Sequence, residues 1–72
     1  STVKEKIEKL KEKLKVLTAQ KAEVATEEGM PEGTRRARSE SIDAEINQVI
    51  SQIAELTSQL VEEESQGGGS EA

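Results

Sequence analysis

The side chains that could take part in catalysis are hydroxyls, carboxylates, lysines and arginines, because the chain contains no histidine and no cysteine. A serine or threonine nucleophile needs a neighbouring base, which here would be a lysine or a carboxylate tuned by a buried pocket. Structural zinc sites are built from cysteine and histidine, so the usual ligands are missing. We therefore predict no catalytic residue and no cofactor.

Clustered carboxylates are the groups that could bind a hard cation. They occur at Glu27 and Glu28 and in the run 62–64, which is three glutamates. Their spacing matches no calcium-binding loop, and a di-metal bundle motif would need Glu-x-x-His. We interpret these acids as solvated charges and predict no metal site.

Three arginines, Arg35, Arg36 and Arg38, form the most distinctive local feature. Guanidinium groups bind phosphates and carboxylates, so this segment could be a tip that binds an acidic protein partner. Arg-x-x-Arg followed by Ser39 also resembles a cleavage site for basic-residue-specific proteases on an exposed loop. The structural alternative is that the arginines begin a helix and pair with nearby acids. Those acids are Glu23, Glu27, Glu28 and Glu40.

Two series of apolar residues define the elements that must position these side chains. The steps are 4, 3, 4, 3 and 7 residues in the first series and 4, 3, 4, 3 and 4 in the second. This is the heptad spacing of packed helices rather than the alternation of a strand, so we predict helices over residues 2–28 and 41–64. The two seams are Val3, Ile7, Leu10, Leu14, Leu17 and Val24, and Ile42, Ile46, Val49, Ile53, Leu56 and Leu60.

Local signals indicate where the helices begin and end. Thr2 and Glu5 have the spacing of a capping box. Gly29 can adopt the left-handed conformation that ends a helix, and Pro31 cannot continue one. Because residues 34–40 place no apolar side chain on the seam, we predict a loop over 29–40 and a second helix that starts between 34 and 41.

The charge distribution favours an antiparallel hairpin. Six lysines lie within residues 4–15, whereas residues 40–72 contain eight acids and neither lysine nor arginine. Reversal at the loop would place the lysines beside the acids at 62–64 and the arginines beside those at 23–28. Exposed ion pairs contribute only ~0–1 kcal/mol each, so they would choose the orientation rather than supply the stability.

Two polar residues, Lys21 and Glu28, occupy seam positions of the first predicted helix. A polar seam residue can fix the register of two helices at some cost in stability. The alternative for Lys21 is an aliphatic stem that lies along the edge of the core with its charge in water. For Glu28 the alternative is a frayed helix end next to the loop.

The apolar face of the second helix is wider than a single seam, because Ile50 and Val61 flank it. Such a face is typical of helix bundles. We predict an all-α, coiled-coil-like antiparallel hairpin that dimerises into a four-helix bundle, with Ile50 and the two seams in the shared core. Both a closed hairpin and a swapped dimer fit the length of the predicted loop.

Composition narrows the choice of partners. A net charge of −5 argues against nucleic acid, which requires a basic field. No apolar run approaches the ~20 residues of a membrane span. The lysines alternate with glutamates and no aromatic residue is present, which also argues against a membrane surface. We expect a soluble chain without a signal segment.

The last residues, 66–72, have the composition of a flexible linker and are predicted to form a flexible tail outside the helical hairpin of residues 1–65. The segment Gly67, Gly68, Gly69, Ser70 resembles an engineered spacer.

The first predicted helix, together with the terminal Gly/Ser spacer, resembles designed coiled-coil proteins, because lysine and glutamate alternate around a seam of valine, isoleucine and leucine, as in residues 3–17. The resemblance covers about half of the chain and implies helical association without any active residue. The second helix departs from that style. Its Asn47, Gln48, Ser51 and Gln52 are more typical of natural or selected sequences. A natural coiled-coil segment with an added spacer is therefore the alternative.

Two function classes follow from these observations. The first is a non-catalytic module that self-assembles through its apolar seams, with a homodimer as the expected state. The alternative is a helical arm that offers the arginine tip or the apolar face of the second helix to another protein.

Overall fold

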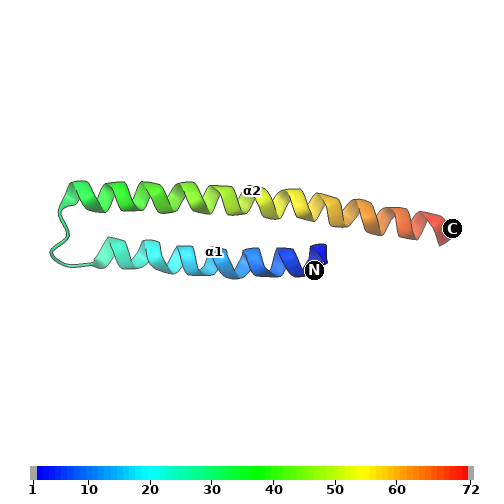
Figure 1. Cartoon of the computed structure of the whole chain (residues 1–72), viewed down its shortest axis with the longest axis horizontal. Helices are drawn as coiled ribbons and strands as arrows, with labels where there is room; N and C mark the ends of the chain where they lie inside the picture. Colours follow the sequence, from blue (N-terminus) through cyan, green and yellow to red (C-terminus); the bar gives the residue numbers. More distant parts are fainter. Residues whose placement is uncertain (1, 72) are drawn as a thin grey trace.

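The computed structural model describes the backbone of residues 2–71 and the side chains of residues 2–66. It contains two α-helices, α1 (Val3–Thr26) and α2 (Glu32–Glu71), which lie side by side and antiparallel (Figure 1). The molecule is a rod of 62 × 16 × 15 Å, and its described residues contain no strand. The predicted all-α, antiparallel helical hairpin is confirmed.

The predicted capping box begins α1. The Thr2 hydroxyl accepts a hydrogen bond from the Glu5 N–H at 3.1 Å, and the Glu5 carboxylate accepts one from the Thr2 N–H at 2.8 Å. Each bond satisfies an N–H group that the first helical turn leaves without a partner. The bond from the Thr2 backbone, followed by that with its side chain, lowers the pKa of Glu5 below its ordinary value of 4.5.

The chain reverses through residues 27–31, which is shorter than the predicted loop. Glu27, at the end of α1, has an extended backbone with φ −67° and ψ 122°. Gly29 has φ +80°, the left-handed conformation that glycine adopts without steric cost. These two residues turn the chain away from α1 and toward α2.

The predicted loop over 29–40 is wrong, because α2 begins at Glu32. The Arg35 N–H donates to the Pro31 carbonyl at 2.9 Å and closes the first turn. Proline is well suited to a position just before a helix, and the acidic Glu32 is favourable in the first turn. Arg35 and Ser39, both half-buried, continue the heptad spacing of the seam backwards from Ile42.

The predicted end of the second helix at residue 64 is also wrong, because α2 continues to Glu71. No proline interrupts this segment, and each added residue contributes one backbone hydrogen bond. The flexibility predicted for residues 66–72 stays a prediction; residue 72 and the side chains of residues 67–71 lie outside the described part. At about 1.5 Å per residue, α2 is roughly 24 Å longer than α1, and its end projects past the start of α1 (Figure 1).

The core lies between the two helices and is thin. Four side chains of the described residues are buried: Ile7, Leu17, Val24 and Val49. Eight other seam residues are only half-buried. They are Val3, Leu10, Leu14, Ile42, Ile46, Ile53, Leu56 and Leu60. The two seams therefore face each other as predicted, but neither is fully covered.

Candidate functional site

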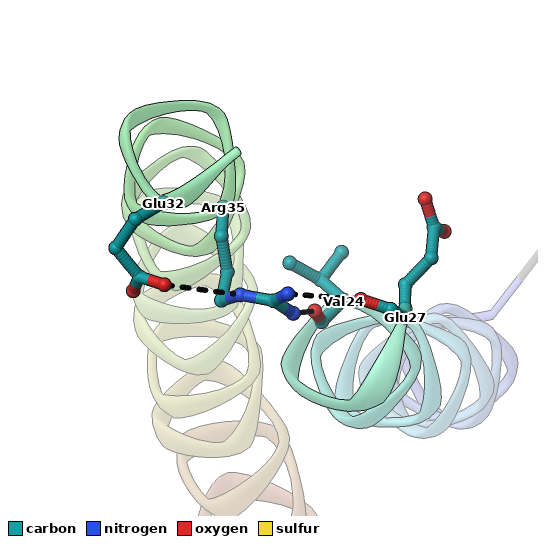
Figure 2. A network of polar contacts seen from close by, with 4 residues as sticks. All are labelled: Val24, Glu27, Glu32 and Arg35. Atoms are coloured by element: carbon teal, nitrogen blue, oxygen red, sulfur yellow. Dashed lines mark hydrogen bonds and ion pairs between the residues drawn. The ribbon is translucent and has the colours of Figure 1, made fainter. Parts of the chain in front are cut away.

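Arg35 links the start of α2 to the end of α1. Its guanidinium group donates hydrogen bonds to the main-chain carbonyls of Val24 and of Glu27, the latter at 2.8 Å. Its Nε lies 3.6 Å from the carboxylate of Glu32. Figure 2 shows the guanidinium between the Glu32 side chain and the two carbonyl oxygens. The side chain of Arg35 is only 23% exposed, so it is part of the packed turn.

This arrangement explains how α1 ends. The last turn of a helix has carbonyls without intrahelical partners and a partial negative charge. No basic residue lies in the last turn of α1, so its own sequence supplies no compensating cation. Arg35 provides both the donors and the positive charge from the neighbouring helix.

The arginine segment is therefore divided between two roles. Arg35 binds backbone carbonyls and Glu32, whereas Arg36 and Arg38 are exposed. The structural alternative is confirmed in its first part, since the arginines lie in the first turns of the second helix. Its second part is not: within the described residues, no ion pair joins the arginines to Glu23, Glu27, Glu28 or Glu40. All three lie within α2 rather than on an exposed loop, and the Glu27 group that binds Arg35 is the carbonyl and not the carboxylate.

A hollow of about 250 Å³ lies beside this turn and spans both helices. Its lining comes from the end of α1 and the first turns of α2: Val24, Ala25, Glu32, Arg35, Arg36, Ser39 and Glu40. The hollow shows that Ala25 and Ser39 lie on the same side of the hairpin.

Charged contacts between the helices are few among the described residues. Lys21 Nζ lies 2.6 Å from Asp43 Oδ1, and both side chains are 46% exposed. This pair joins α1 to α2 from one of the two seam positions that hold polar residues. The predicted pairing of the α1 lysines with the acids at 62–64 is not formed within the described residues, because those acids lie in the part of α2 that runs past α1.

A second apolar stripe on α2 is left uncovered by α1. We define it as Ile50, Ala54, Thr57 and Val61, which are spaced by 4, 3 and 4 residues and are all exposed. Ile50 is 49% and Val61 56% exposed. Ile50, predicted to lie in a shared core, is thus not covered within one chain. On α1, Val16 is similarly exposed, at 54%.

The described part of the chain has neither a metal-binding cluster nor a helix that could span a membrane. It contains no cluster of three or more potential metal ligands. Neither α1 nor α2 combines the length and apolar character that a membrane crossing requires. The features that stand out are the Arg35 anchor, the exposed arginines and the second apolar stripe.

Comparisons with protein-family models, with curated proteins and with solved structures find no match for this chain.

Proposed function

We propose that this protein is a non-catalytic self-association module, in which two copies of the hairpin form a four-helix bundle. The observation that carries the proposal is the incomplete burial of the apolar residues. Eight seam side chains are half-buried, and Ile50 and Val61 lie on an exposed stripe beside them.

The size of the core supports the same proposal. A two-helix chain of 72 residues is near the limit at which one apolar core stabilises a fold, and small domains often gain stability by oligomerisation. A second hairpin laid against the first would cover both the open edge of the seam and the second stripe. Twofold dimers are the commonest closed assemblies.

The test is the mass in solution of three chains at micromolar concentration, measured by light scattering. The unmodified chain should have about twice the monomer mass of 7.8 kDa. Ile50→Glu places a charge in the proposed interface and should shift the mass toward the monomer. Val16→Glu changes an equally exposed valine on α1 and should leave the dimer intact.

Two results would refute the proposal. One is a stably helical monomer for the unmodified chain at these concentrations. The other is a dimer that Ile50→Glu and Val16→Glu weaken equally, because the second stripe would then have no special part in association.

The exposure of Arg36 and Arg38 favours a second candidate function, in which the turn end of the hairpin binds an acidic protein segment. Arg35 has to be left out of this role, since it binds the α1 carbonyls. Replacing Arg36 and Arg38 with alanine should abolish binding of a poly-aspartate peptide while helicity is retained. Unchanged binding, or no binding by the unmodified chain, would eliminate this candidate.

A further inference from the structure

We infer that each copy inserts Ile50 into a hollow on α1 of a second copy, so that α1 of one chain packs against α2 of the other. This inference rests on the proposed self-association and specifies its geometry. Four observations support it. α1 has an apolar hollow, this hollow and Ile50 lie on the same side of the hairpin, both lie at the same level along the rod, and the two helices have opposite net charges.

The hollow lies on the surface of α1 and has a mainly apolar lining. Leu14, two alanines and the methyl group of Thr18 provide carbon surface, and the stems of two lysines border it. The lining residues are Lys11, Leu14, Lys15, Thr18, Ala19 and Ala22. A protruding aliphatic side chain fits such a hollow in the manner of a knob in a hole.

Ile50 and this hollow open on the same side of the hairpin. Ala25 and Ser39 share a side, because both line the hollow beside the turn. Ile50 follows Ser39 by 11 residues, which is close to three helical turns, and Thr18 precedes Ala25 by seven, which is close to two. Ile50 therefore lies on the same side of the hairpin as Ser39, and Thr18 lies on the same side as Ala25.

Ile50 and the hollow also lie at the same level along the rod. The ion pair between Lys21 and Asp43 fixes which residues of the two helices are opposite. Leu14 precedes Lys21 by seven residues and Ile50 follows Asp43 by seven. Because the helices are antiparallel, these equal steps run in the same direction, and each covers about 10 Å.

A twofold axis parallel to the helices preserves this level. It places α1 of one copy against α2 of the other, so that Ile50 of each chain meets the hollow around Leu14 of its partner chain. The contact is then isologous, since each copy contributes one isoleucine and one hollow.

The charges of the helices favour this axis over the alternative. From Val3 to Thr26, α1 has seven lysines and four glutamates, a net charge of +3. Between residues 32 and 66, α2 has eight acids and three arginines, a net charge of −5. The axis perpendicular to the helices would place α1 on α1 and α2 on α2, so that like charges face each other. Surface charges select orientation even where they add little stability.

Cysteine pairing tests the geometry, because the chain has no cysteine of its own. Lys15→Cys lies in the hollow and Ile50→Cys replaces the inserted side chain. After the two reduced variants are mixed and oxidised, the mixed disulfide should exceed the half that random pairing gives, as counted by mass spectrometry. Val16→Cys is the matched control: it lies next to Lys15 in the sequence, is 54% exposed, and points about 100° away around α1. Mixed with Ile50→Cys, it should give no excess.

The outcomes separate this inference from the proposed function. If light scattering gives a dimer but Ile50→Cys pairs mainly with itself, α2 packs on α2 and the inference is overturned while self-association stands. An equal yield from Lys15→Cys and Val16→Cys would overturn it as well. If the unmodified chain is a monomer, the proposed function fails first.

Discussion

Replacement of Arg35 with glutamine should destabilise the hairpin by about 2–3 kcal/mol. Hydrogen bonds from a charged donor contribute roughly 1.5–3 kcal/mol each, and Arg35 makes two, to the carbonyls of Val24 and Glu27. The bond to Glu27 is exposed and the bond to Val24 is only partly buried, so each is worth no more than the lower end of that range. The ion pair with Glu32 adds little, because the Glu32 side chain is 77% exposed.

The measurement is urea unfolding followed by circular dichroism at one fixed chain concentration, since association would contribute to the apparent stability. Arg36→Gln is the matched control on an exposed neighbour and should change the free energy of unfolding by no more than about 0.5 kcal/mol. Arg35→Lys keeps the charge but loses the planar fork, so it should fall between the two. An Arg35→Gln variant that is no less stable than Arg36→Gln would refute the role of Arg35 at the end of α1.

Further predictions concern the turn, the core, the capping box and the ion pair between the helices. Gly29→Ala should lower the free energy of unfolding by about 1–2 kcal/mol, because alanine is strained at φ +80° although no atom lies within 4 Å of its Cβ. Gly33→Ala, inside α2, should instead raise it by up to about 1 kcal/mol. Val49→Ala should lower the free energy of unfolding by about 2 kcal/mol, because Val49 is only 2% exposed and its truncation leaves a cavity. Folding lowers the pKa of Glu5, so the stabilising contribution of Glu5 is complete above pH 4.5 and disappears as the pH falls through the lowered pKa. The unmodified chain should therefore be more stable than Glu5→Gln at neutral pH, and this difference should shrink as the pH is lowered, as measured by denaturant unfolding at several pH values. Lys21→Gln should cost less than about 1 kcal/mol and only at low salt, since the partly exposed pair is screened; an equal cost in high salt would contradict this account.

The fold could be predicted from the sequence because it depends on short-range signals. The heptad steps from Val3 to Val24 and from Ile42 to Leu60 fix two helices and the faces by which they pack. The capping box at Thr2 and Glu5 depends on spacing alone, and Gly29 on its conformational freedom. Each of these features requires only local geometry.

The start of α2 could not be found by counting apolar residues. Arg35 and Ser39 occupy the seam positions before Ile42, and a polar residue there gives no hydrophobic signal. The partners of Arg35 at the end of α1 are main-chain carbonyls, which carry no sequence signature. Two signals would have indicated the earlier start of α2. One is that the heptad spacing continues backwards from Ile42, and the other is that the last turn of α1 has no cation of its own.

The predicted contact between the α1 lysines and the acids at 62–64 failed for a related reason. It assumed helices of matching length, whereas α2 has 40 residues and α1 has 24. Because the turn is short, the extra residues of α2 extend beyond Val3 at the start of α1. The acids at 62–64 therefore lie beyond the lysines of α1 instead of beside them. The resemblance of residues 3–17 to designed coiled coils stays a prediction, as does the homodimer.

The central claim is that folding of the hairpin and association of two copies are coupled. Its most direct measurement is the midpoint of thermal unfolding, followed by circular dichroism over about a hundredfold range of chain concentration. A dimer that unfolds to separate chains should show a midpoint that rises by roughly 10 °C over that range. A midpoint independent of concentration would show that a single chain completes its own core, and would contradict the account.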